Sequence, residues 1–249
     1  MLEINGSFGE GGGQVLRTSL SLSCLLKKPF KIFNIRIKRK KPGLMPQHLM
    51  GIRALKLISN AEVKGDSAGS LELVFEPKEV KAGEYVFDIG TAGSVSLLLQ
   101  ALLPPLIFAK DKSSLSLKGG THVPFSPTFN YINEVFIPAI KMLGIEIEAN
   151  IENYGFYPKG GGKVKAEIMP ADRITSMNFL ERGEIKRIKG ISAVANLPLS
   201  IAERQKDSAL KILASQGLNA EIETLPVPAL SNGTFLFLKA ETEKFFAGF

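Results

Sequence analysis

Apolar and polar residues in the first part of the chain follow helical and extended patterns in turn. An apolar segment at 15–26 follows a glycine loop at 11–13, and a strand-like run at 30–37 comes next. Within residues 47–59, apolar side chains recur every three positions, as on one face of a helix. Residues 71–75 alternate between apolar and polar, which predicts a half-buried strand.

The same order of patterns recurs about eighty residues later. The predicted elements are a strand at 85–89, a glycine loop at 90–94, an apolar helix to about 108, a strand at 113–117, a helix at 131–143 and alternating runs at 145–149 and 164–168. Each unit therefore combines two amphipathic helices with a small sheet, which predicts an α+β fold. We expect repeat units at about 1–80 and 81–181.

The pattern changes near residue 182. A charged amphipathic helix at 202–216 and strands at 219–225 and 234–240 follow, without a glycine loop. This indicates a smaller α/β domain over 182–249. The chain ends in an apolar run, and we expect that it stops short of a natural domain boundary.

Basic residues are concentrated in one part of the chain. Residues 11–61 contain no Asp or Glu but eleven Lys or Arg, whereas the other residues carry 20 basic against 24 acidic side chains. A local basic field of this kind attracts a polyanion, most commonly one that carries phosphate. The alternative is a solvated surface with chance clustering of charge.

Composition excludes several classes of protein. With 249 residues and 45% hydrophobic side chains, the chain can form one or two domains. It has no apolar stretch long enough to span a bilayer and no signal peptide. Cys24 is the only cysteine, which rules out an internal disulfide and is typical of a cytoplasmic protein.

The loop Gly9-Glu10-Gly11-Gly12-Gly13-Gln14 is the first candidate site. It matches neither the P-loop nor the dinucleotide fingerprint. Glycines before a helix nevertheless let backbone N–H groups converge on an anion. Glu10 then indicates a divalent cation between the carboxylate and a phosphate, and the alternative is a tight turn with a solvated Glu.

Further candidates lie on the predicted helices and strands of the basic segment. Arg17 shares a helical face with Gln14, and its guanidinium suits bidentate phosphate contacts. If residues 36–39 continue the strand, Arg36 faces one side and Arg39 the other. Gln47 stands at the expected N-terminus of the following helix, where anions bind favourably.

The two histidines, His48 and His122, leave two interpretations open. Each is a general acid or base, or a hydrogen-bonding residue of the structure. Neither has Asp, Glu or Cys at the spacing of a metal site, so zinc is not expected.

Five segments together resemble the RNA 3'-terminal phosphate cyclase family in order and spacing. They are GEGGGQVLRTSLSLS, IRIKRKKPGLMPQHL, DIGTAGSVSLLLQALLPPL, KGGTHVPFSPTFNYINEVFIPAI and GFYPKGGGKVKAEI. The resemblance implies repeated units of two helices on a four-stranded sheet, as in the enolpyruvyl transferases, with a small inserted domain that begins near residue 182. It also implies that the third repeat of the family is missing from this chain.

The resemblance implies a ligase that uses ATP and Mg²⁺ or Mn²⁺ to turn an RNA 3'-phosphate into a 2',3'-cyclic phosphate. The steps are adenylation of a histidine, AMP transfer to the RNA and attack by the 2'-hydroxyl. Glu10 matches the metal-binding position and Pro127 a position near the adenine. The positions expected to bind phosphates of ATP or RNA are Gln14, Arg17, Arg36, Arg39 and Gln47.

The resemblance places the nucleophilic histidine beyond Phe249, and neither His48 nor His122 matches it. The catalytic residue is therefore not identified within this sequence. A non-catalytic, cyclase-like RNA-binding protein is the alternative function. A small-molecule transferase related to the enolpyruvyl transferases is a further one, against which the acid-free basic segment argues.

Overall fold

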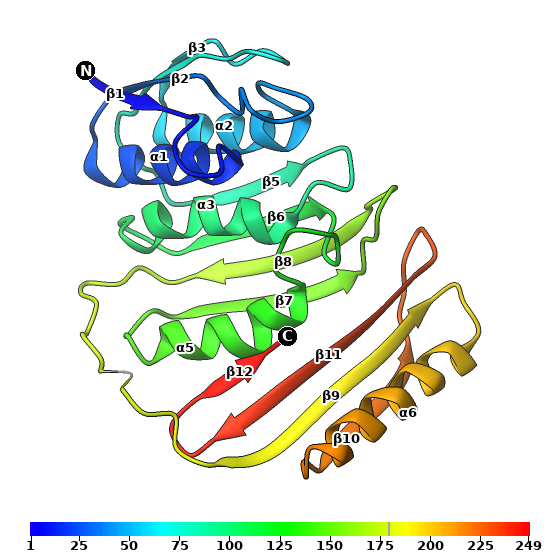
Figure 1. Cartoon of the computed structure of the whole chain (residues 1–249). Helices are drawn as coiled ribbons and strands as arrows, with labels where there is room; N and C mark the ends of the chain where they lie inside the picture. Colours follow the sequence, from blue (N-terminus) through cyan, green and yellow to red (C-terminus); the bar gives the residue numbers. More distant parts are fainter. Residues whose placement is uncertain (179) are drawn as a thin grey trace.

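A computed structural model describes residues 1–178 and 180–249. It contains three four-stranded sheets and a small number of helices, so the expected α+β class is confirmed (Figure 1). No helix among the described residues is long and apolar enough to cross a membrane.

The first sheet has the order β1-β2-β4-β3. Its strands are β1 (Leu2–Asn5), β2 (Phe30–Phe33), β3 (Glu62–Lys64) and β4 (Leu73–Glu76), and its helices are α1 (Gly13–Leu26) and α2 (Pro46–Ser59). β1 and β2 are parallel, and the other pairs are antiparallel. Pro46 starts α2 well because the first helical position needs no N–H donor.

The second sheet repeats this arrangement in the order β5-β6-β8-β7, with one parallel and two antiparallel pairs. Its strands are β5 (Glu84–Asp88), β6 (Ser113–Gly119), β7 (Ile147–Asn153) and β8 (Gly162–Ile168). Its helical segments are α3 (Val95–Ile107), α4 (Phe129–Tyr131), the π-helical turn η1 (Ile132–Phe136) and α5 (Ile137–Lys141).

The helices of the two units form one hydrophobic core. α1 lies beside α3, and α2 contacts both (Figure 1). Leu16 and Leu20 from α1, Leu55 from α2 and Leu102 from α3 are almost fully buried in this shared cluster. Burying each such side chain contributes about 1.5–3 kcal/mol, so the packing fixes how the starts of the three helices lie relative to one another.

The third sheet follows residue 182 and has the order β10-β9-β11-β12. It consists of β9 (Ile185–Ala195), β10 (Ala220–Pro226), β11 (Gly233–Thr242) and β12 (Phe246–Gly248), with the helix α6 (Leu199–Ser215) packed on one side. Val135 and Phe156 of the second unit share a separate apolar cluster with Phe235 and Phe237 of β11.

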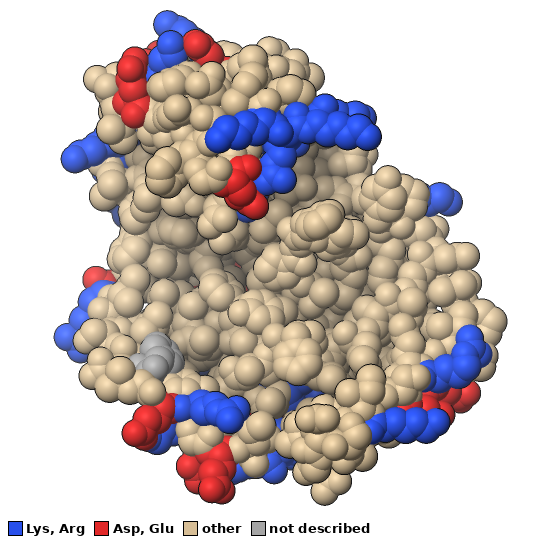
Figure 2. Space-filling model, viewed as in Figure 1, with Lys and Arg blue, Asp and Glu red and all other residues tan. Residues whose placement is uncertain are grey.

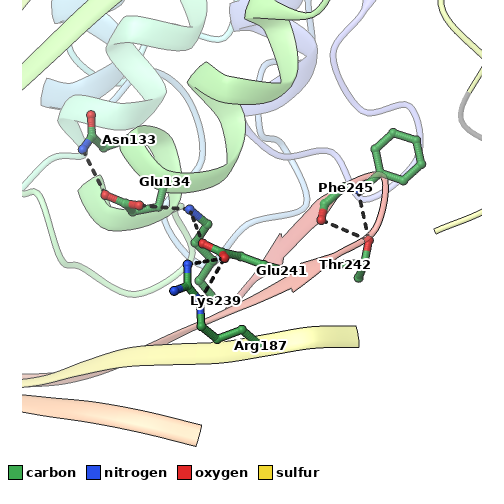
Figure 3. A network of polar contacts seen from close by, with 7 residues as sticks. All are labelled: Asn133, Glu134, Arg187, Lys239, Glu241, Thr242 and Phe245. Carbon is green, nitrogen blue, oxygen red and sulfur yellow. Dashed lines mark hydrogen bonds and ion pairs between the residues drawn. The ribbon is translucent and has the colours of Figure 1, made fainter. Parts of the chain in front are cut away.

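An ionic network also joins this sheet to the second unit (Figure 3). The Lys239 ammonium lies 3.3 Å from a carboxylate oxygen of Glu134 in η1 and 3.5 Å from one of Glu241. Arg187 pairs with Glu241 at 2.6 Å, and Lys239 lies 5.1 Å from the ring centroid of Phe246. The network ties the π-helical turn to β11.

Two predicted elements differ from the structure. The strand expected at 30–37 ends at Phe33, because Asn34 and Arg36 adopt left-handed backbone conformations with φ of +56° and +54° and turn the chain. The expected alternation of Arg36 and Arg39 along a strand is therefore wrong. The helix expected at 131–143 contains the π-helical turn at its centre, which a period of 3.6 residues does not reveal.

Candidate functional site

The candidate site lies where the starts of α1, α2 and α3 meet. Gly12 precedes α1, and no side chain caps the first turn, so its N–H groups are free to bind an anion. A side chain at Gly12 would clash with Glu10 and Arg39, and one at Gly13 would clash with His48. The two glycines thus let the ends of Glu10 and Arg39 and the ring of His48 approach the backbone of the loop closely.

Gln47 connects α2 to the second glycine loop. Its side-chain oxygen accepts a hydrogen bond from the backbone N–H of Ser94 at 3.2 Å. The Ser94 hydroxyl in turn accepts from the N–H of Leu97 at 3.2 Å and caps α3. Because the oxygen of Gln47 is occupied, its NH₂ group is the part that remains to donate to a ligand.

His48 is held as a neutral hydrogen-bond donor. Its Nδ1 accepts from the backbone N–H of Met45 at 3.1 Å, so the ring proton of the neutral form is on Nε2. Burial, with smaller contributions from the charges of Arg36 and Arg17, lowers the pKa of His48 to about 4. Near neutral pH, the Nε2–H of His48 therefore points toward Gly13 without adding a charge.

Arg17 brings a partly desolvated positive charge to the same place. Burial lowers the pKa of Arg17, and its Nε has no hydrogen-bond partner among the described residues. Leaving a buried charged donor unpaired is costly, and an anionic ligand removes this cost. One cavity of about 460 Å³ is lined by Arg17 together with Gln47, His48 and Ser94.

Glu10 and Arg39 form an ion pair at the edge of the first glycine loop. The Oε1 atom of Glu10 lies 3.1 Å from Nη2 of Arg39, and both side chains are exposed. Residues 1–178 and 180–249 contain no group of three or more His, Cys, Asp or Glu that could hold a metal. A single carboxylate is compatible with Mg²⁺ or Mn²⁺ only where phosphate oxygens and water supply the other ligands.

Arg36 stabilises the turn that follows β2. Its Nη1 donates to the carbonyl oxygens of Lys41 and Gly43 at 2.9 and 2.7 Å. Lys38, Lys40 and Lys41 are exposed on this turn and form no ion pair with any described residue. Figure 2 shows the resulting row of Lys and Arg side chains beside a largely uncharged hollow.

Two predicted site residues lie apart from this group. Gln14 is exposed and lines a different, mostly apolar cavity of about 490 Å³ between β1 and α1, although it is one turn from Arg17. Pro127 is exposed and follows the segment 123–126, which lines the cavity of Arg17. The structure therefore brings together Arg17, Gln47 and His48, with Glu10, Arg36 and Arg39 around the loop.

His122 is a structural residue. It is only 8% exposed, its Nε2 lies 2.9 Å from the Asn130 side-chain oxygen, and its Nδ1 lies 2.9 Å from the Thr121 hydroxyl. The ring lies 4.2 Å from that of Phe235, between centroids. Burial lowers the pKa of His122 to about 4. Of the two open interpretations, the hydrogen-bonding one is therefore correct for this histidine.

Sequence reasoning missed several residues of the cavity. Ser94, Phe125 and Tyr157 line it, and none was a candidate. The glycine loop at 90–94 before an apolar helix was the available signal for Ser94. For Phe125 and Tyr157 no local signal exists, because only the fold brings their loops to Arg17.

The uncapped start of α1, two glycine loops and a partly buried arginine form the kind of site in which proteins bind phosphate groups. The family model described as RNA 3'-terminal phosphate cyclase matches residues 8–241. The chain belongs to the RNA 3'-terminal phosphate cyclase family.

Three relatives with that name illustrate the similarity. A protein of Ignicoccus hospitalis is 46% identical over 254 residues, which cover all of this chain and 72% of the relative. One of Saccharolobus solfataricus is 49% identical over 250 residues, or 73% of its length. One of Nostoc punctiforme is 43% identical over 256 residues, or 74% of its length. In all three alignments the whole of this chain is covered.

Proposed function

We propose that this chain acts as an RNA 3'-terminal phosphate cyclase, which uses ATP to convert an RNA 3'-phosphate into a 2',3'-cyclic phosphate. ATP gives up AMP with release of pyrophosphate, and the AMP is joined to the RNA 3'-phosphate. The 2'-hydroxyl then attacks that phosphorus, and AMP leaves. The observation that carries the proposal is the partly buried guanidinium of Arg17, whose Nε lacks a hydrogen-bond partner among the described residues and which lines the cavity beside the second glycine loop.

In this proposal the phosphates lie between the starts of α1 and α3. Arg17 supplies the buried charge, and the NH₂ of Gln47 and the Nε2–H of His48 are neutral donors beside it. Gln47 and His48 are already fixed by hydrogen bonds within the chain, so they need little rearrangement when charge develops on a phosphate.

Glu10 is the proposed metal-binding carboxylate. When bound, Mg²⁺ or Mn²⁺ would neutralise charge on the ATP phosphates. Arg39 now pairs with Glu10, and occupation of the carboxylate by a metal would release the Arg39 guanidinium toward phosphate. Arg36 stabilises the turn after β2 through its two hydrogen bonds. The RNA backbone would pass along the exposed lysines of this turn, which are Lys38, Lys40 and Lys41.

The two described histidines have no free ring lone pair. The only lone pair of neutral His48 accepts from Met45, and that of His122 faces the Thr121 hydroxyl. An imidazole whose lone pair is occupied is a poor nucleophile toward phosphorus. This supports the proposal that adenylation does not take place on either residue, and it keeps the alternative of a cyclase-like RNA-binding protein open to test.

We further propose that residues 1–181 form a body of enolpyruvyl transferase-like repeats and that 182–249 form the inserted domain. The matching strand orders of the first two sheets support the repeats. A cytoplasmic location is proposed from the single cysteine. Pro127 is proposed to lie near the adenine, because it adjoins the cavity-lining segment 123–126.

Binding of matched RNAs tests the function. A short RNA with a 3'-phosphate should bind this chain at least about tenfold more tightly than the same RNA with a 3'-hydroxyl, since a charged hydrogen-bond partner is lost. Arg17→Gln should remove the difference, whereas Arg53→Gln on the exposed face of α2 should preserve it. Equal affinity of the unaltered chain for both RNAs would contradict the proposal.

A further inference from the structure

Phe125 is a fully exposed aromatic side chain with an unfavourable backbone. Its exposure is 104%, and its φ is +62°. A bulky residue in the left-handed region is an outlier that the surrounding structure must impose. The ring makes no aromatic contact with another described residue, so packing within the described chain does not account for its position.

The loop that carries Phe125 is fixed at both ends. The Ser126 hydroxyl donates to the Val123 carbonyl at 3.1 Å, and the Phe129 N–H donates to the Thr121 carbonyl at 3.1 Å. The Thr128 hydroxyl oxygen accepts from the N–H of Tyr131 at 3.2 Å. The exposed ring is therefore held by an ordered support, which lowers the entropy cost of binding to it.

Tyr157 presents a second exposed ring to the same cavity. It is 71% exposed, whereas its neighbour Phe156 is buried against His122 and Phe235. Gly160, three residues later, packs so closely on Thr91 and Ala92 that a side chain there would clash with their backbone. The loop of Tyr157 is thus anchored on the second glycine loop.

Both rings line the cavity of about 460 Å³ that also contains Arg17, Gln47 and His48. Exposed aromatic rings beside groups that bind phosphate are the combination by which proteins hold single-stranded nucleic acid, because every base has a face that stacks. The cavity volume lies within the range of sites for small organic ligands.

We propose that Phe125 and Tyr157 form a stacking surface for a nucleobase whose phosphate lies at Arg17. The inference rests on the proposed function and adds the recognition of a base to that of the phosphates. The base belongs either to the terminal nucleotide of the RNA or to ATP. The chemistry of stacking is common to both, and it tolerates any base.

The test compares ligands with and without a base. Phe125→Asn removes the ring and keeps a residue that tolerates positive φ, and Tyr157→Leu removes the second ring. Loss of either ring should weaken binding of the ligand that stacks by about 5- to 100-fold. The ligands are an RNA 3'-phosphate with a normal or an abasic terminal nucleotide, and ATP or tripolyphosphate. Phe108→Asn, at a partly exposed ring beyond α3, is the control.

A loss for normal but not abasic RNA assigns the surface to the RNA base, and a loss for ATP but not tripolyphosphate assigns it to adenine. Equal losses with and without a base would overturn the inference, because stacking would then contribute nothing. The inference would also be overturned if the unaltered chain binds these ligands and both variants bind them with the same affinity. If the unaltered chain binds neither ligand, the proposed function fails first and the inference with it.

Discussion

The side-chain oxygen of Gln47 accepts a hydrogen bond from the backbone N–H of Ser94, 47 residues further along the chain, at 3.2 Å. Gln47 lies in the first turn of α2 in the first unit, and Ser94 caps α3 in the second. This hydrogen bond thus links the first turns of two helices that face the same cavity, and it orients the NH₂ of Gln47 as a donor.

Replacing Gln47 by Glu separates these two roles. The carboxylate still accepts from Ser94, so the melting temperature should change by no more than a few degrees. It replaces a donor with a negative charge, however, and should weaken ATP binding by about tenfold or more. Gln47→Leu, the control, should lower both stability and affinity. Unchanged ATP affinity of the Glu variant, measured by calorimetry, would show that the amide does not touch phosphate.

Glu10→Gln should reduce the metal-dependent part of ATP binding and leave RNA binding almost unchanged. The reason is that a neutral amide binds Mg²⁺ or Mn²⁺ much more weakly than a carboxylate. Titrations of ATP with and without metal, and of RNA without metal, measure the two effects. Similar losses in all titrations would mean that Glu10 serves mainly to hold Arg39 and the loop.

The exposed lysines of the turn after β2 should contribute to the salt dependence of RNA binding. Single replacements in this turn should each lower the slope of log affinity against log salt by about 0.7, which is the value per phosphate contact for a single strand. The variants are Lys38→Gln, Lys40→Gln and Lys41→Gln, together with Arg39→Gln in the same turn. Lys211→Gln on α6 is the control. A slope that no variant changes would show that RNA does not follow this turn.

Arg36→Gln should behave differently from the lysine variants. It removes two hydrogen bonds that hold the turn to Lys41 and Gly43, in addition to a charge. We expect a loss of about 1–3 kcal/mol in the free energy of unfolding together with weaker RNA binding. Denaturant titration measures the first effect, and an unchanged midpoint would contradict the structural role.

His122 should make the protein less stable in mild acid. Its pKa is about 4 in the folded chain but near 6.5 when exposed, so the unfolded state takes up the proton first as the pH falls. The stabilisation is complete above pH 6.5 and is lost between 6.5 and 4. In His122→Gln, the slope of unfolding free energy against pH should be shallower by about 1 kcal/mol per pH unit in that window. An unchanged slope would contradict the prediction.

Much of the local structure follows from the sequence, because it depends on neighbouring residues. Helical spacing of apolar residues predicted α1, α2 and α6, and alternation predicted at least two strands in each sheet. The sequence patterns did not predict β1, β3, β9 or β12. The glycine loop and the position of Arg17 on α1 were equally readable. The resemblance added the family, which the match over residues 8–241 confirmed.

The functional geometry depends on contacts between distant residues, which local patterns do not contain. The sequence grouped Gln14 with Arg17, but packing of α1 on α3 places them in different cavities. It left the two histidines equivalent, whereas the Met45 N–H fixes the proton of His48 and the shell of Asn130, Thr121 and Phe235 encloses His122.

The sequence by itself thus indicated the family, most of the helices and strands, and residues whose chemistry suits phosphate binding, since each can be recognised within a short segment. Tertiary structure alone decided which of these residues share a cavity, which donors lack a partner, and that Phe125 and Tyr157 stand beside Arg17. The physical reason is that desolvation and hydrogen bonding depend on every atom within a few ångströms, and folding draws those atoms from all parts of the chain.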